Sequence, residues 1–379
     1  MEWKKLQNGS DIRGVASGDG ATLTPDVMRR IGGAFAAWLA DRLGRSSEDL
    51  TVSVGRDSRL TGPVLMSALI EGMASAGVRV LDFGLASTPA MFMSTVTPGF
   101  DCDGAVMLTA SHLPPERNGC KFFTARGGLD KADITELLAR AEQQAAAPAA
   151  RTGTIVATDF MNVYAAELVT LIRRGVADPE HPQEPLLGLR VVVDAGNGAG
   201  GFFVDRVLQP LGADTCGSQF LEPDGRFPNH VPNPEHPDAM AALSHAVLEH
   251  RADFGIIFDP DVDRAAAVEA TGREIHRNRL VALAAAMVLR EHPGTTVVTD
   301  SITSDGLSAF IETDLGGIHH RFRRGYRNVI NEAIRLNAEG QACWLAIETS
   351  GHAALKENHF LDDGAFLVAK LLIELARAR

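Results

Sequence analysis

The stretch GAVMLTASHLPPERNGCK, residues 104–121, decides the fold prediction because it joins an apolar run to a polar loop. Residues 104–108 predict a short buried strand. Pro114 and Pro115 prevent a helix from starting directly after it, so Ser111 is expected on a loop at the end of this strand. A serine hydroxyl is a weak nucleophile unless a base or cation activates it, and His112 and Lys121 are close in sequence. In isolation, Ser111 is more typical of a turn that closes on its own backbone.

Strands alternate with helices along the rest of the chain, which predicts an α/β protein. Pro25 suits the first turn of a helix and Gly44 the position after its last turn, so one helix is expected between them. Strands are expected at residues 50–54, 78–83, 104–108, 189–194, 254–258, 295–299 and 343–347. Helices are expected at residues 63–76, 202–208, 279–290 and from 304 onward.

An alanine-rich segment at residues 142–150 is typical of a linker and marks the first expected domain boundary. We expect three consecutive, similar α/β domains, each a mixed sheet flanked by helices. Their expected ranges are residues 1–152, 153–276 and 277–379. No sequence period accompanies this repetition, so it is a prediction about architecture alone.

The composition restricts the classes of function. With a net charge of -12 over 379 residues, the chain does not offer a nucleic-acid surface, and an anionic substrate would need local cations or a metal ion. Four cysteines without C-x-x-C spacing indicate neither a zinc site nor a disulfide framework, which favours a reducing compartment. No apolar N-terminal segment or membrane span is visible. A soluble intracellular protein is therefore expected; its oligomeric state stays open.

Three carboxylates, Asp259, Asp261 and Asp263, follow the apolar strand at residues 254–258. Alternate residues of an extended segment share one side, so these carboxylates are expected to converge on one hard divalent cation. The loop is not an EF-hand, since Arg264 and Ala270 stand where that loop needs Gly and Glu. Three protein ligands leave room for a substrate phosphate, which suits Mg²⁺. The alternative is a solvated acidic turn with Arg264 as its counter-charge.

Three other polar segments could bind a sugar phosphate. Glu348, Ser350 and His352 follow the strand at residues 343–347 and could bond sugar hydroxyls or transfer a proton, although a helix N-cap with a spare histidine would look similar. The cluster at residues 323–327 is the densest basic run of an acidic chain and could hold an anion on a loop between a strand and a helix, although a solvated charged face is the simpler interpretation. Arg13, beside Gly14, could contact phosphate, although a surface pair with Asp11 is the simpler interpretation.

As an ordered set, these loops resemble the α-D-phosphohexomutase family, which includes phosphoglucomutase, phosphomannomutase and phosphoglucosamine mutase. The similarity covers essentially the whole chain and is highly specific. Residues 350–365 are most similar to plant and algal members described as phosphoglucosamine-mutase-like, whose compartment would be the cytoplasm or the plastid stroma. The motifs are DIRG at 11–14, GRDSR at 55–59, TASHLPPERNGCKFF at 109–123, DPDVDR at 259–264, Gly325-x-Arg327 and ETSGH at 348–352.

The resemblance implies roles for these residues. Ser111 would carry the phosphate and bind Mg²⁺ together with Asp259, Asp261 and Asp263. Glu348 and Ser350 would bind sugar hydroxyls. The positions near the reacting groups are Arg13, His112, Lys121, Arg264, Arg327 and His352. Phosphate would pass from Ser111 to a hexose 1- or 6-phosphate through a hexose 1,6-bisphosphate, with Lys121 and His352 as candidates for proton transfer.

The sequence departs from the family in two places. Leu113 stands where the serine loop commonly has Asn, so one polar contact is expected to be missing. No Ser-Gly-Thr occurs in the 379 residues, although the family's fourth domain carries a phosphate clamp with that motif. A missing clamp would weaken binding and reorientation of the bisphosphate, so the chain is expected to be a fragment or an enzyme with impaired turnover.

Three alternatives stay open. Asp259 and Asp261 also fit the D-x-D pattern of a haloacid-dehalogenase-like phosphotransferase, in which Asp259 would be the nucleophile. The glycines at residues 196–201 satisfy the dinucleotide-binding pattern G-x-G-x-x-G, but a tight turn from strand to helix explains them equally well. Lastly, a three-domain phosphosugar-binding protein without turnover would keep the same loops.

Overall fold

The structure is a computed structural model that describes residues 2–143 and 152–379. The chain folds into two compact units, Met1–Tyr164 with Pro223–Pro228, and Ala165–Glu222 with Asn229–Arg379. The first unit contains one β-sheet and the second contains two. Each sheet is mixed and carries helices, which confirms the expected fold class. The expected linker lies almost wholly outside the described residues, and the three domain boundaries stay predictions.

The sheet of the first unit has the strand order β1-β2-β6-β5-β3-β4-β8, with β7 paired to β6. Strands β3, β4, β5 and β8 are parallel neighbours, while β6 runs antiparallel to both β2 and β5. The strands are β1 (Gln7–Asn8), β2 (Asp11–Val15), β3 (Thr51–Arg56), β4 (Arg79–Leu85), β5 (Gly104–Leu108), β6 (Arg117–Thr124), β7 (Gly127–Gly128) and β8 (Ile155–Ala157).

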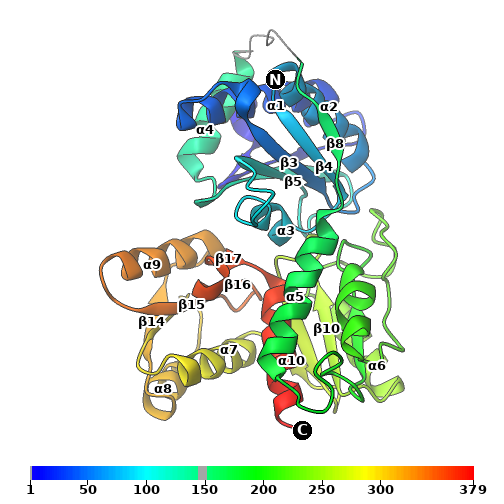
Figure 1. The fold of residues 1–379 in the computed structure, drawn as a ribbon, viewed down its shortest axis with the longest axis vertical. Coiled ribbons are helices and arrows are strands. Elements are labelled where there is room, and N and C mark those ends of the chain that lie inside the picture. The colour runs from blue at the N-terminus through cyan, green and yellow to red at the C-terminus, as the bar shows by residue number, and fades with distance from the viewer. Residues whose placement is uncertain (1, 144–151) are drawn as a thin grey trace. The chain divides into compact units, whose positions relative to one another are not determined.

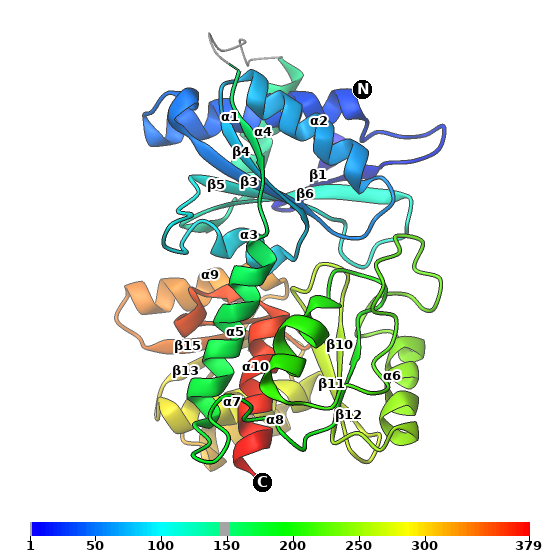
Figure 2. The ribbon, with the colours of Figure 1, turned by 45° about the vertical axis from the view of Figure 1, so that its right-hand side comes forward.

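Helices cover both faces of this sheet. Figures 1 and 2 show α1, α2 and α4 on one face and α3 on the other. The core beneath α1 and α2 contains the buried side chains of Phe35, Leu69 and Val106. The helices are α1 (Pro25–Leu43), α2 (Gly62–Ser75), α3 (Thr88–Met93) and α4 (Lys131–Glu142).

Helix α1 begins and ends where its sequence predicts. The Thr24 hydroxyl accepts a hydrogen bond from Val27 N at 3.4 Å, and Pro25 occupies the first turn. Gly44 ends the helix in the left-handed conformation, with φ of 63°. Two glycines then allow α1 and α2 to approach closely: a Cβ added at Gly32 would lie 2.1 Å from Leu69 O, and one added at Gly72 would lie 2.0 Å from Arg29 O.

Replacement of Gly72 by alanine is expected to destabilise the first unit by about 2 kcal/mol or more, because the new methyl group must push the two helices apart. Alanine has a higher helix propensity than glycine, so propensity alone would stabilise the variant. A net loss of unfolding free energy therefore reports the steric effect. Thermal unfolding of Gly72→Ala measures it, with Gly20→Ala as the control, since a Cβ at Gly20 meets no atom within 4 Å. A melting temperature for Gly72→Ala at or above that of the control would contradict this packing argument.

The first sheet of the second unit has the strand order β12-β11-β10-β9. Strand β10 runs parallel to β9 and antiparallel to β11. Helix α6 packs on this sheet through Met240, Leu243 and Val247. The elements are β9 (Val191–Asp194), a π-helix (Phe203–Leu208), α6 (Pro237–Glu249), β10 (Phe254–Phe258), β11 (Ala265–Glu269) and β12 (Glu274–Ile275).

The second sheet of this unit has the order β14-β13-β15-β16-β17. Helix α9 covers one face through Val329, Ile330, Ala333 and Leu336. The elements are α7 (Asn278–Glu291), β13 (Thr296–Asp300), α8 (Asp305–Ala309), β14 (Ile318–Phe322), α9 (Tyr326–Ala338), β15 (Cys343–Ile347), β16 (Ala353–Leu355), β17 (Leu361–Asp362) and α10 (Gly364–Arg377).

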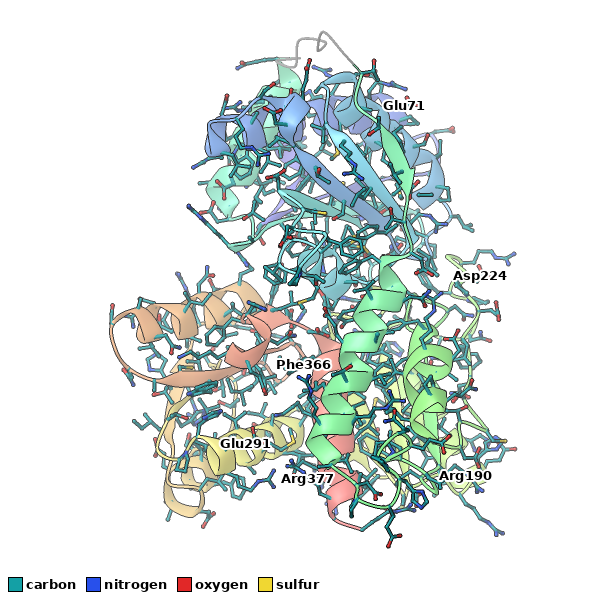
Figure 3. All side chains as sticks on the ribbon, viewed as in Figure 1. Glu71, Arg190, Asp224, Glu291, Phe366 and Arg377 are labelled. Carbon is teal, nitrogen blue, oxygen red and sulfur yellow. The ribbon has the colours of Figure 1, made fainter. Side chains whose placement is uncertain are left out.

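Helix α10 joins the two sheets of the second unit. It contacts both β11 and α7, and Lys370 Nζ lies 3.3 Å from Glu291 Oε2. It also lies beside α5 (Phe160–Val176), where Arg377 Nε donates to Gly175 O at 2.8 Å (Figures 1 and 2; Arg377 and Glu291 are labelled in Figure 3). No helix within the described ranges is long and apolar enough to cross a membrane.

The three polar loops of the predicted site occupy equivalent places in the three sheets. Each follows a strand that is parallel to one neighbour, namely β5, β10 or β15, and each leads into an antiparallel strand, β6, β11 or β16. The carboxyl ends of parallel strands are the usual place for ligand sites in α/β proteins. The architecture therefore repeats even though the sequence shows no period.

The glycine-rich turn after β9 is explained by close packing. A Cβ added at Gly198 would lie 2.5 Å from Pro260 Cα, and one at Gly201 would lie 2.7 Å from Leu221 O. Gly196 has φ of 52° and its N–H donates to Asp194 Oδ1 at 2.8 Å. The helix that follows is the short π-helix. These contacts support the tight-turn explanation of the G-x-G-x-x-G pattern.

Asp194 also holds the loop that faces this turn. His230 Nε2 lies 3.1 Å from Asp194 Oδ2, and the two side chains are 3% and 0% exposed. Burial alone lowers the pKa of the imidazole, but the hydrogen bond and charge of Asp194 outweigh it, so the pKa of His230 lies above its usual value.

This pair predicts a pH-dependent stability. Because the folded protein raises the pKa of His230, its stabilisation is fully present below the pKa of the unfolded chain and is lost as the pH rises through the folded value. His230→Asn is therefore expected to lower the free energy of unfolding by on the order of 2 kcal/mol at pH 6 and by clearly less at pH 8.5. Urea unfolding of both proteins at the two pH values tests this. An equal cost at both would exclude a charged His230.

Candidate functional site

Ser111 lies directly beyond β5, as predicted, and its backbone has a left-handed conformation with φ of 51°. The turn around it is closed by Thr109, whose Oγ1 accepts a hydrogen bond from Ser111 N at 2.8 Å. Ser111 Oγ lies 3.3 Å from Nδ1 of His112. The hydroxyl of Thr109 therefore helps to close the turn that presents Ser111.

Basic side chains come to this loop from neighbouring strands. Arg13, on β2, donates from Nη1 to Ala110 O at 3.2 Å and from Nη2 to Asp11 Oδ2 at 3.0 Å. The expected pair with Asp11 therefore forms, but it is largely buried and not at the surface, since the two side chains are 16% and 9% exposed. Lys121 is buried on β6, opposite Met107 of β5. The sheet order therefore places Arg13 on β2 and Lys121 on β6, next to β5, whose following loop carries Ser111.

The aspartate loop is buried. Asp259, Asp261 and Asp263 are 0%, 0% and 2% exposed, which contradicts the alternative of a solvated turn. One oxygen from each carboxylate lies within 4.8 Å of the others. Three converging carboxylates form a donor set for a hard cation such as Mg²⁺. The residues present therefore fit a divalent metal ion.

The backbone of this loop differs from the extended conformation that was expected to make the carboxylates converge. The segment is a turn and not an extended strand: Val262 has φ of 65° and its N–H donates to Asp259 O at 3.1 Å. A tight turn brings the three carboxylates together as effectively as alternation on a strand would. Gly364 makes room for it, because a Cβ there would lie 3.0 Å from Val262 O.

Arg264 is the counter-charge of this loop. Its Nη2 lies 3.0 Å from Asp259 Oδ2, and its Nη1 donates to Asn233 Oδ1 at 3.0 Å. Burial alone lowers the pKa of the guanidinium, but the carboxylates of Asp259 and Asp263 outweigh it and raise the pKa. With one positive charge beside three buried carboxylates, the loop keeps a net negative charge. A divalent cation would neutralise it.

Glu348 and Ser350 lie in the turn between β15 and β16. Because this turn leads into a strand, the alternative of a helix N-cap is wrong. Glu348 Oε1 accepts from Gly325 N at 2.6 Å, and Ser350 Oγ donates to Glu348 Oε2 at 3.3 Å. Burial raises the pKa of the Glu348 carboxyl above its usual value. The side chain thus links the ETSGH turn to the basic cluster at residues 323–327.

His352 contacts both the ETSGH turn, to which it belongs, and the aspartate loop. Its Nδ1 bonds Asp362 Oδ2, its ring stacks on Tyr326 with centroids 5.0 Å apart, and its backbone pairs with that of Arg264. Burial alone lowers the pKa of His352, but Asp362 and Asp263 outweigh it and raise the pKa. Asp263, His352 and Asp362 form a second group whose ligand atoms lie within 4.8 Å.

Arg327 lies in the first turn of α9, so the basic cluster falls between a strand and a helix, as expected. Gly325 has φ of 121°, a conformation that favours glycine, and it begins this helix. Asp362 is a site residue that the sequence prediction missed. It stands in the stretch at residues 350–365 that resembles plant and algal members, but its bond to His352 spans ten positions and leaves no local pattern.

Family models match the chain in three consecutive segments. They are the phosphoglucomutase/phosphomannomutase alpha/beta/alpha domains I, II and III, at residues 4–147, 166–272 and 276–379. The chain belongs to the phosphoglucomutase/phosphomannomutase family. Membership makes it a phosphohexomutase, an isomerase that transfers phosphate. It follows that the D-x-D pattern belongs to a mutase and not to a haloacid-dehalogenase-like enzyme.

Named relatives agree with this assignment. The chain is 33% identical over 365 residues to a phosphoglucomutase of Neisseria gonorrhoeae, covering 96% of this chain and 73% of that protein. It is 34% identical over 369 residues to a phosphomannomutase/phosphoglucomutase of Pseudomonas putida, covering 97% and 73%. A crystal structure of a family protein from Burkholderia thailandensis superposes with a TM-score of 0.83 at 31% identity, covering 99% of this chain and 77% of that one.

Proposed function

We propose that the chain interconverts hexose 1-phosphate and hexose 6-phosphate through a phosphate carried on Ser111. The observation that supports this most is the serine loop, in which a hydroxyl follows the carboxyl end of β5 beside His112 and the cations of β2 and β6. Positioning and charge stabilisation dominate phosphoryl transfer, and this loop supplies both.

The reaction would run in two balanced transfers. In the first, the bond between phosphorus and Ser111 Oγ breaks as the free hydroxyl of the sugar phosphate attacks, and that hydroxyl gives its proton to a base. The product is a hexose 1,6-bisphosphate. After the bisphosphate reorients in the site, its other phosphate is transferred back to Ser111 Oγ. The sugar oxygen that loses this phosphate takes up the proton. Lys121 and His352 are the proposed proton-transfer groups.

The other site residues would bind the sugar phosphate. We assign Glu348 and Ser350 to the sugar hydroxyls and Arg13 and Arg327 to phosphate oxygens. Arg264 and His112 are proposed as catalytic residues near the reacting groups. Asp259, Asp261 and Asp263, with an oxygen on Ser111, would hold Mg²⁺, which would offset the charge of the phosphate when bound. A phosphosugar is the proposed partner and a hexose 1,6-bisphosphate the activator. The cytoplasm or plastid stroma is the proposed compartment.

Phosphorus NMR tests the proposal directly. Glucose 1-phosphate, mannose 1-phosphate and N-acetylglucosamine 1-phosphate are each incubated with the chain, Mg²⁺ and a trace of glucose 1,6-bisphosphate. The appearance of the 6-phosphate resonance at the expense of the 1-phosphate is expected for at least one sugar. If all three sugars bind, as shown by titration calorimetry, and none is converted, the chain is a phosphosugar-binding protein and the proposal fails.

A further inference from the structure

Arg59 lies beneath the serine loop and is fully buried at 0% exposure. Its guanidinium carbon lies 5.3 Å from the ring centroid of Phe227, in a segment that belongs to the same unit. All of its side-chain nitrogens donate. Nε donates to Asp57 Oδ2 at 3.2 Å, Nη1 to Pro114 O and Arg117 O at 2.7 and 2.8 Å, and Nη2 to Ser111 O and Leu113 O, both at 2.5 Å.

Asp57, Arg59 and Thr109 form a hydrogen-bonded cage around the backbone of Ser111, and Asp57 bonds both of the other two. Its Oδ2 accepts from Arg59 Nε and also from Thr109 Oγ1 at 2.8 Å, and its Oδ1 accepts from Arg59 N at 3.0 Å. Thr109 Oγ1 in turn accepts from Ser111 N. The N–H of Ser111 is therefore held by Thr109 and its C=O by Arg59, and both partners are anchored on one buried carboxylate.

The cage can stabilise an unfavourable backbone conformation, because Ser111 adopts φ of 51°. A serine prefers other backbone conformations, so the left-handed one persists only where the surroundings impose it. Strained residues of this kind concentrate at functional sites. The planar guanidinium can bond several carbonyls at once in a fixed geometry, which lysine cannot do. Its positive charge also lies beneath the residue that would carry a phosphate.

We infer that Arg59 and Thr109, both anchored on Asp57, are positioning residues that hold the backbone of Ser111 so that its hydroxyl can be phosphorylated. This inference rests on the proposed function of Ser111. It assigns a role to Asp57 and Arg59 of the GRDSR motif, whose side chains the proposed reaction does not use. These residues act through Ser111 and need no contact with the sugar.

Thr109→Val tests the inference, because it keeps the shape of the side chain and removes the hydroxyl. The rate of phosphoenzyme formation from glucose 1,6-bisphosphate is expected to fall about 100-fold, while the bisphosphate concentration at half-maximal rate changes little. Thr95→Val is the matched control, since Thr95 is buried in the same unit and its hydroxyl bonds only Phe92 O, at 2.7 Å, among the contacts of the described residues. Its rate should match that of the unchanged protein.

Two further variants keep the test decisive. Thr109→Ser retains the hydroxyl and should restore the rate to within about threefold of the original, which separates positioning from a general loss of fold. Arg59→Lys keeps the charge and should be slow like Thr109→Val. If Thr109→Val is phosphorylated at the rate of the unchanged protein, or Thr109→Ser as slowly as Thr109→Val, the positioning role is wrong. The proposed function of Ser111 would not be affected. If the unchanged protein takes no phosphate on Ser111, the proposed function falls as well.

Discussion

Replacement of Ser111 by alanine is expected to lower the interconversion of hexose phosphates by about 10⁴-fold or more. The alanine side chain has no oxygen to accept or return phosphate, so both transfers are lost, as happens when an enzyme loses its nucleophile. An assay coupled to glucose 6-phosphate oxidation measures the loss. Binding of the sugar phosphate should remain, because the proposed sugar contacts, Glu348 and Ser350, belong to another part of the chain.

Ser58→Ala is the control for this experiment. Ser58 is also buried in the first unit, and its hydroxyl has no hydrogen-bond partner among the described residues. Its activity should equal that of the unchanged protein. If Ser111→Ala retains activity within about tenfold of the control, Ser111 does not carry the phosphate.

The second large effect concerns the aspartate loop. Chelation of divalent cations should abolish activity and Mg²⁺ should restore it, because the proposed transfer needs the phosphate charge to be offset. Asp261→Asn removes one of three buried carboxylates and is expected to raise the half-saturating Mg²⁺ concentration by about 100-fold. Titration calorimetry with Mg²⁺ alone measures the affinity without any turnover.

Asp238→Asn is the matched control, since this carboxylate lies in the same unit and is 82% exposed. Its Mg²⁺ affinity and activity should not change. Equal Mg²⁺ affinity for Asp261→Asn and the control would show that the three carboxylates do not hold the metal. In that case the second group, Asp263, His352 and Asp362, would be the next set of ligands to test.

The sequence was most informative where one strand carries its own signal. Strands β5, β10 and β15 have the expected limits, because each is a five-residue apolar run followed by a polar loop. Several helices were not predicted. Helix α10 is one example: it is buried against both β11 and α7, and no local pattern reveals these distant contacts.

In the site, too, features set by neighbouring residues were predicted, and features set by distant contacts were not. Ser111 lies where its loop predicts. Arg59 was visible only as part of a motif, because its bond to Ser111 O joins residues 52 positions apart. The three carboxylates of the aspartate loop converge as predicted, but through a turn and not through an extended segment. The turn at Val262 depends on packing against Gly364, which no local pattern reveals.

The most direct measurement is the location of phosphate after incubation with labelled glucose 1,6-bisphosphate. The phosphoenzyme is digested at acidic pH, and the labelled peptide is sequenced by mass spectrometry. We expect one phosphate on Ser111, stable to hydroxylamine as a phosphoserine is. A hydroxylamine-sensitive acyl phosphate on Asp259, or no covalent phosphate in a preparation that interconverts the sugars, would contradict the central claim.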